Sequence, residues 1–237
     1  MQDTTATGVR ENKLMKTFNH AFVELPSLVR NDGETRTYTT PTGQKYPSVT
    51  TVLSKTADKT FLHEWRNRVG HEEAAKITRR AANRGTAVHK MCETYVLNED
   101  LRALDVSHYD KFLFNQIQPV LTNCVDNIRV SEGALFSHNL RVAGSVDLVC
   151  DFNGQPAVVD FKTSLRPKKL EWIHDYMIQA SMYSYMFWEM VGVLCPNIVV
   201  IIAVESESTP QVFCERTVNW LHYGKARCEQ YHSLIAG

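Results

Sequence analysis

The sequence lacks the signatures of several large protein classes. Its six cysteines are scattered and include no C-x-x-C pair, which disfavours a zinc ribbon and favours free thiols in a reducing compartment. No apolar run approaches the roughly 20 residues needed to span a membrane, and the first residues lack the apolar core of a secretory signal. We therefore expect a soluble, cytoplasmic protein with no membrane contact.

Neither sign of charge is in excess. Lys and Arg number 26, Asp and Glu also 26, and the formal net charge is zero, so any affinity for nucleic acid must come from a local basic patch. No internal repeat, low-complexity tract or linker divides the 237 residues, and a chain of this length can bury one core. We expect a disordered tail over residues 1–16 and a single domain over residues 17–237.

The most informative stretch is RVAGSVDLVCDFNGQPAVVDFKTS, residues 141–164. Two β-forming runs flank Asn153-Gly154, a strong signal for a tight hairpin. With these residues as the turn, continued pairing sets Asp147 opposite Asp160, and alternation places both aspartates and Lys162 on one face. The opposite face is expected to carry Val146, Leu148, Val159 and Phe161.

Two aspartates in this register predict a metal site. Directly opposed carboxylates destabilise a hairpin, and a divalent cation removes that penalty because hard oxygen ligands suit Mg²⁺ or Mn²⁺. Lys162 could then hold a water or a phosphate beside the metal. An Asp-x-Lys alone is more typical of a solvated strand edge, but Asp147 stands in an otherwise apolar run at the matching register.

Periodicity and turn chemistry predict the surrounding elements. Helical regions are expected over 58–98, 107–127, 171–191 and 219–235, and strands over 128–137, 197–205 and 211–217. Gly70 and Gly85 are expected to break the first helical region, and Pro119 to kink or split the second. A hairpin about residues 41–43 is expected to cap the domain, and Ser48 to N-cap a short helix.

Further polar side chains are candidates for the same site. His89 and Glu93 are four residues apart on one helix face, although a lone helical histidine is more often structural. Glu132 lies on an expected strand and could equally be solvated. Arg84 ends an arginine-rich helical segment that could follow a phosphate backbone or complement the helix dipole.

The order of these motifs resembles the PD-(D/E)XK nuclease superfamily, and within it the RecB-like branch. The matching text is Arg84-Gly85-Thr86…His89, Gly144-Ser145-Val146-Asp147, Asp160-Phe161-Lys162-Thr163-Ser164 and Gln179…Tyr183. The wider text, PSVTTVL at Pro47 and WRNRVG at Trp65, resembles phage-encoded relatives of mitochondrial genome maintenance exonucleases. A phage origin would place the protein in the host cytoplasm.

The resemblance implies an α/β, restriction-endonuclease-like core over about residues 84–205. Its central mixed β-sheet would be flanked by helices and preceded by an N-terminal helical segment. Some relatives hold an iron–sulfur cluster through one cysteine before the core and three after it. This chain has no such C-terminal group of cysteines, so we expect no iron–sulfur cluster.

The resemblance also implies a role for each matching residue. The expected ligands of Mg²⁺ or Mn²⁺ are His89, Asp147, Asp160 and the backbone carbonyl of Phe161, with Glu93 or Glu132 as further candidates. Lys162 would orient or activate the attacking water. The expected substrate contacts are Gln179, Tyr183, Arg84, Thr163 and Ser164. Lys168 and Lys169 are added from the basic connector of residues 166–169, which could hold a DNA backbone beside such a site but is more often a solvated loop.

These features together predict a metal-dependent DNA exonuclease that acts on single strands or ends in replication, recombination or repair. One alternative is a structure-specific or nicking endonuclease on the same core. Another is a non-catalytic nucleic-acid-binding module, but such modules usually lose an acid or the lysine, and this chain retains both aspartates and the lysine. A metal-dependent hydrolase of small molecules fits the basic and aromatic residues less well. No feature specifies an oligomeric state.

Overall fold

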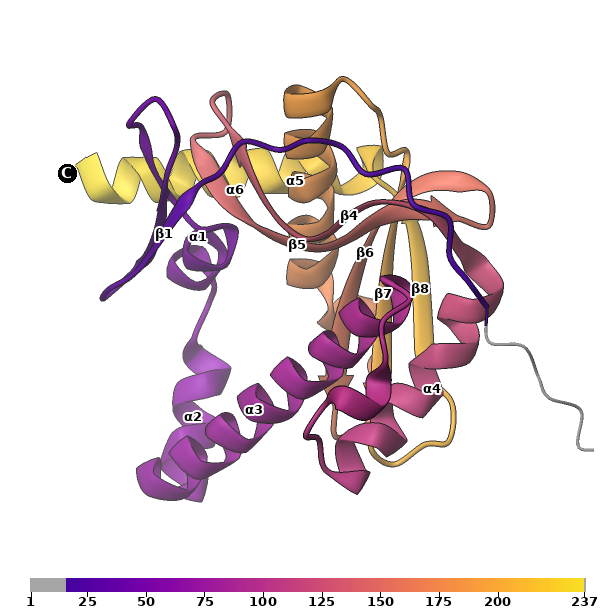
Figure 1. The fold of residues 1–237 in the computed structure, drawn as a ribbon. Coiled ribbons are helices and arrows are strands. Elements are labelled where there is room, and N and C mark those ends of the chain that lie inside the picture. Colours follow the sequence, from indigo (N-terminus) through magenta and orange to yellow (C-terminus); the bar gives the residue numbers. More distant parts are fainter. Residues whose placement is uncertain (1–15, 237) are drawn as a thin grey trace, which may run out of the picture.

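A computed structural model describes residues 16–236 as a mixed α/β fold with two β-sheets (Figure 1). A five-stranded sheet runs through the core, and a three-stranded sheet formed by the N-terminal part lies beside it. The expected disordered tail falls, apart from Lys16, outside the described residues.

The central sheet has the strand order β4-β5-β6-β7-β8. Its strands are β4 (Val125–Ser137), β5 (Val142–Phe152), β6 (Gln155–Ser164), β7 (Asn197–Val204) and β8 (Gln211–Arg216). Strands β6 and β7 are parallel and are connected through α5 (His174–Val191), while the other neighbours are antiparallel. The sheet is therefore mixed, as expected.

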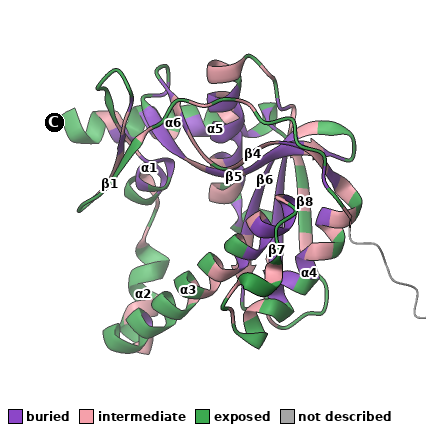
Figure 2. Cartoon of the chain, in the orientation of Figure 1, coloured by how far each residue is buried: buried purple, intermediate pink, exposed green. Residues whose placement is uncertain are grey.

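Helices cover both faces of this sheet. The first face carries α3 (His71–Val96) and α4 (His108–Cys124), and the second carries α1 (Val49–Thr56), α5 and α6 (Val218–Ala236). Strand β7 is buried along almost its whole length because its alternate side chains enter the two cores. Figure 2 shows this burial through the middle of the sheet.

The N-terminal sheet contains β1 (Val29–Asp32), β2 (Arg36–Thr39) and β3 (Lys45–Pro47). Ser48 follows β3 and accepts a 3.0 Å hydrogen bond from the Thr51 N–H, so it N-caps α1 as expected. Ser48 also forms an isolated β-bridge with Ala143 at the start of β5. The N-terminal sheet is thereby fixed next to the central one, before the chain continues into α2 (Thr60–Val69).

The expected break at Gly85 is wrong, and so is the alternative that Pro119 splits its helix. The chain does break at Gly70, whose φ is +91°, but α3 continues through Gly85. Strong helix formers surround Gly85, and one helical glycine costs only about 1 kcal/mol. Helix α4 likewise continues through Pro119, because fully buried Ile117 and Leu121 anchor it on both sides of the proline.

Short 3₁₀ turns complete the connections, with η1 (Leu101–Ala103) before α4 and η2 (Leu170–Trp172) before α5. The expected helix over 171–191 therefore begins as a separate 3₁₀ turn. Within residues 16–236, the structure contains no helix with the length and apolar character needed to cross a membrane.

Candidate active site

A cleft of about 630 Å³ opens where β5 and β6 separate. Its walls come from the N-terminal hairpin, α3, the middle of β4 and β5, the end of β6, and α5. Of the residues expected to act, the cleft is lined by His89, Glu93, Glu132, Asp147, Lys162, Gln179 and Tyr183.

The separation of β5 from β6 shapes this cleft. The hairpin turn lies at Asn153-Gly154, both with positive φ, and the register matches the expected one. The ladder ends at Leu148↔Val159, one residue before Asp147 would pair with Asp160. Instead, the Asp147 Oδ2 atom accepts a 2.8 Å hydrogen bond from the Phe161 N–H. A side chain thus replaces the backbone partner, and the two strands diverge.

The expected division of the hairpin into two faces is only partly correct. Leu148, Val159 and Phe161 share the core beneath α3 and α4, but Val146 lies in the core beneath α5. The neighbouring strand β4 is irregular at this level, because Glu132 has a φ of +50°. Regular alternation therefore fails around Asp147.

One imidazole and two carboxylates converge at this irregularity. His89 Nδ1 lies 3.5 Å from Asp147 Oδ2 and 3.7 Å from Glu132 Oε1, and the ligand atoms of all three residues fall within 4.8 Å of one another. Ligand atoms this close could share one ion, and a set rich in carboxylates suits Mg²⁺ or Mn²⁺. Glu132, rather than Glu93, completes the group.

A contact at the second ring nitrogen also orients His89. Its Nε2 lies 2.7 Å from the Phe161 carbonyl oxygen, so Nε2 is the donor and Nδ1 faces the carboxylates. Metal-binding histidines usually donate their second N–H to such an acceptor. The Phe161 carbonyl, expected to be a metal ligand, here accepts this hydrogen bond and lies 3.4 Å from Lys162 Nζ.

Asp160 and Lys162 form a second pair beside this group. Lys162 Nζ lies 2.5 Å from Asp160 Oδ2, and Gln179 Nε2 donates a 3.1 Å hydrogen bond to Asp160 Oδ1. Lys162 Nζ also lies 5.1 Å from the centre of the Tyr176 ring. The Asp160 side chain is only 2% exposed, so α5 and Lys162 determine its position.

Burial and charge shift the titration of this site. Burial raises the pKa of Asp160 to about 6, although the Lys162 ammonium opposes that rise. Burial works against a charged His89, but Asp147 and Glu132 outweigh it and raise the pKa of His89 to about 10. Burial also works against a charged Lys162, and the Asp160 and Asp147 carboxylates overcome it and raise the pKa of that amine.

Tyr183 packs closely against β5. A Cβ atom on Gly144 would lie 2.8 Å from the Tyr183 hydroxyl oxygen, so only glycine leaves room for this ring. Tyr183 is 3% exposed, and it lines the cleft together with Gln179 from the same helix. The pair that the sequence marks as substrate contacts thus forms one wall of the site.

Other expected substrate contacts already have partners within the protein. Arg84 Nη1 lies 2.6 Å from Glu205 Oε1, with both side chains largely buried, and Arg84 Nε donates to Thr163 Oγ1 at 3.5 Å. The Ser164 hydroxyl donates to the Arg166 carbonyl at 2.7 Å. Glu93, which lines the cleft, accepts from Lys90 at 2.9 Å.

The basic connector lies outside the residues that line the cleft. The Lys168 N–H donates a 2.6 Å hydrogen bond to the Gln211 side chain. Lys169 Nζ lies 3.7 Å from Glu171 and 5.3 Å from the centre of the Trp172 ring. The structure therefore does not bring these two lysines to the group formed by His89, Glu132 and Asp147.

Sequence reasoning missed one wall of the cleft. Arg30, Arg36, Tyr38, Ser48 and Thr50 come from the N-terminal hairpin and the start of α1, and all line it. The hairpin about residues 41–43, formed by β2 and β3, was expected only to cap the domain, and Arg30 on β1 was not part of that expectation. The available signal was Asp32-Gly33, a turn signal between Arg30 and Arg36 that predicts a hairpin carrying both arginines.

Comparison with known proteins gives partial matches. No protein-family model matches the chain. Mitochondrial genome maintenance exonuclease 1 of Mus musculus is 28% identical over 131 residues, which cover 52% of this chain and 38% of the relative. The protein of the same name from Homo sapiens is 28% identical over 130 residues, with the same coverage. The chain thus matches less than two-fifths of the length of these relatives.

Among solved structures, a protein from Eubacterium rectale described as a candidate exonuclease aligns with 65% of this chain and 66% of its own. The TM-score is 0.43 and the sequence identity is 12%. The names of the curated relatives agree with the expected likeness to genome maintenance exonucleases. Membership of the PD-(D/E)XK superfamily stays a prediction.

Proposed function

We propose that this protein is a metal-dependent DNA exonuclease of the PD-(D/E)XK type that hydrolyses phosphodiester bonds of single strands or DNA ends. The observation that carries the proposal is the meeting of Asp147, His89 and Glu132 in one cleft that Lys162 also lines, with Lys162 held by the buried Asp160. The exonuclease names of the relatives support the same activity.

His89, Glu132 and Asp147 would hold the divalent ion, with Asp160 and the Phe161 carbonyl beside them. When bound, such an ion neutralises charge on a phosphate and lowers the pKa of a water molecule. The irregular backbone at Glu132 brings this carboxylate to the two other ligands.

Lys162 would supply a fixed positive charge. Asp160 holds its amine within 2.5 Å and raises its pKa, so the group is an ammonium at neutral pH. An ammonium donates hydrogen bonds and can orient a water or stabilise a phosphate oxygen, but it cannot accept a proton. Gln179 would keep Asp160 in place, and Tyr183 would shape the inner wall.

The proposal is tested on linear and circular single-stranded DNA with Mg²⁺ or Mn²⁺. We expect shortening of the linear strand that EDTA abolishes and that Asp160→Ala removes, with the circle left intact. Labels at the 5′ and 3′ ends report the direction of digestion. Cutting of the circle would favour an endonuclease, and DNA binding without cleavage under any divalent ion would favour a binding module.

A further inference from the structure

The N-terminal hairpin presents two arginines on the wall of the cleft. Strands β1 and β2 pair Asp32 with Arg36 and Arg30 with Tyr38, and directly paired residues share a face of the hairpin. Arg30, Arg36 and Tyr38 all line the cleft that contains the metal-ligand group. Segments far apart along the chain thus border the same hollow.

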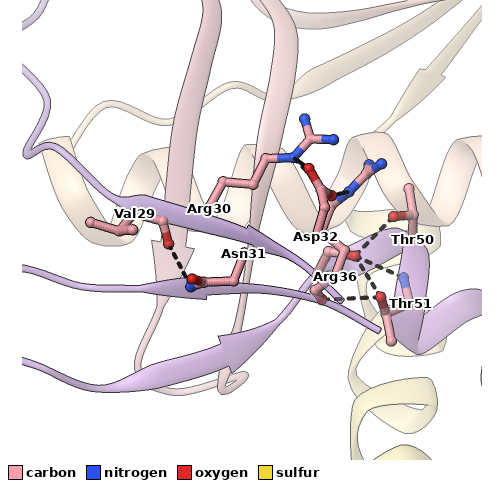
Figure 3. Close-up of polar contacts among 8 residues, drawn as sticks. Val29, Arg30, Asn31, Asp32, Arg36, Thr50 and Thr51 are labelled. Atoms are coloured by element: carbon pink, nitrogen blue, oxygen red, sulfur yellow. Dashed lines mark hydrogen bonds and ion pairs between the residues drawn. The ribbon is translucent and has the colours of Figure 1, made fainter. Parts of the chain in front are cut away.

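Asp32 fixes the orientation of both guanidinium groups. Its carboxylate accepts from Arg30 Nε at 2.9 Å and from Arg36 Nε at 2.9 Å (Figure 3). Both contacts use the Nε atoms. Among the described residues, no hydrogen bond or ion pair occupies the terminal Nη groups of either arginine, so these groups are free to bind an anion.

The backbone of this hairpin is anchored at the start of α1. The Arg36 carbonyl oxygen accepts from the Ser48 N–H at 2.9 Å and from the Thr51 hydroxyl at 3.1 Å, the latter contact visible in Figure 3. Ser48 in turn bridges to Ala143, directly before Gly144 of the site. The Arg36 main chain is therefore coupled to β5 through contacts that substitution of the arginine side chains leaves intact.

From this geometry we infer that Arg30, Asp32 and Arg36 form a preassembled clamp for a backbone phosphate of the DNA strand that enters the site. Guanidinium Nη groups match the oxygens of a phosphodiester. The three side chains are 41–58% exposed, and ion pairs this exposed contribute little to stability. The inference rests on the proposed nuclease function, because it assigns the same cleft to a nucleic-acid strand.

The clamp is tested by the affinity for fluorescent single-stranded DNA in EDTA, where no hydrolysis occurs. We expect the double variant Arg30→Gln/Arg36→Gln to bind roughly tenfold more weakly at low salt, because two charge-assisted contacts are lost. The slope of log K against log salt should fall by about 0.7, since the clamp neutralises one phosphate of a single strand. Unchanged affinity and slope would overturn the clamp.

The chain offers a matched control. Arg102 donates to Asp100 with the same two-residue spacing, but this pair lines no part of the active-site cleft. Arg102→Gln should leave both affinity and slope unchanged. If Arg102→Gln lost as much DNA affinity as the double variant, the loss would be a general effect of charge. That result would overturn the assignment of the clamp to Arg30 and Arg36.

Asp32→Ala separates an oriented clamp from a simple positive patch. Removing a negative charge strengthens DNA binding if only charge matters, whereas an oriented clamp loses its geometry. We expect affinity to fall roughly threefold, an effect smaller than that of losing an arginine contact. Tighter binding would contradict the positioning role of Asp32.

Hydrolysis assays distinguish this inference from the proposed function. With Mg²⁺, the double arginine variant should show a raised KM and a nearly unchanged kcat. Metal-dependent cleavage with an unaltered KM would contradict the clamp and leave the proposed nuclease function standing. DNA binding that depends on the arginines, without cleavage under any divalent ion, would support the clamp and contradict the nuclease function.

Discussion

Asp160 shows how strongly the surroundings shift the pKa of a single side chain in this site. It is 2% exposed, contacts both Lys162 and Gln179, and has a pKa of about 6. At neutral pH His89 carries a positive charge, because Asp147 and Glu132 overcome the effect of its burial and raise its pKa to about 10. Both residues must lose a proton before they can bind a cation.

Metal affinity should therefore depend on pH. Between about pH 6.5 and 8, the His89 proton must leave, so Mn²⁺ affinity should rise roughly tenfold per pH unit. Below about pH 6, Asp160 is also protonated, and the dependence should become steeper. Calorimetric titration at several pH values measures this slope. His89→Gln should make the affinity almost independent of pH above 6.5, and a flat profile in the natural protein would contradict the role of His89.

The residues predicted from sequence were those that a local pattern marks. The Asn153-Gly154 turn gives the register that brings Asp147 near Asp160, and helical spacing places Gln179 and Tyr183 on nearby turns of α5. Arg30 and Arg36 have no such motif. Their place in the cleft depends on the bridge between Ser48 and Ala143, a tertiary contact that no local pattern encodes.

At the level of elements, the separation of β5 from β6 and the close packing of α5 create the site. The ladder stops at Leu148↔Val159, and the Tyr183 ring occupies the space where a Gly144 side chain would lie. The hairpin was predictable because Asn and Gly readily adopt positive φ. The continuity of α3 through Gly85 was not predicted, because the helix formers around this glycine outweigh its cost of about 1 kcal/mol.

Two glycine substitutions test this account of the elements. Gly144→Ala should lower the free energy of unfolding by about 1–3 kcal/mol, because its Cβ would lie 2.8 Å from the buried Tyr183 hydroxyl oxygen. Gly85→Ala should raise it by about 0.5–1 kcal/mol, since this helical position has no atom within 4 Å of the added Cβ. Urea unfolding of both variants measures the difference. If Gly144→Ala changed the free energy of unfolding by the same amount as Gly85→Ala, the close packing at Gly144 would be contradicted.

At the scale of the whole molecule, a chain of zero net charge concentrates charge locally. Carboxylates gather at the inner end of the cleft, and Arg30 and Arg36 stand on its wall. The resemblance to a known superfamily implied the mixed sheet flanked by helices, and local patterns predicted most of its individual strands and helices. They could not predict that the N-terminal hairpin would form part of the site, because that depends on packing between distant segments.

The most direct measurement is the rate of mononucleotide release from end-labelled linear single-stranded DNA as Mg²⁺ is titrated. The protein should degrade the strand only with the divalent ion, and Asp147→Asn should lower the rate by on the order of 10² or more. Asp105→Asn, at an exposed aspartate outside the cleft, should stay within about twofold. An Asp147→Asn variant as active as the natural protein would contradict the central claim, as would the absence of hydrolysis with both Mg²⁺ and Mn²⁺.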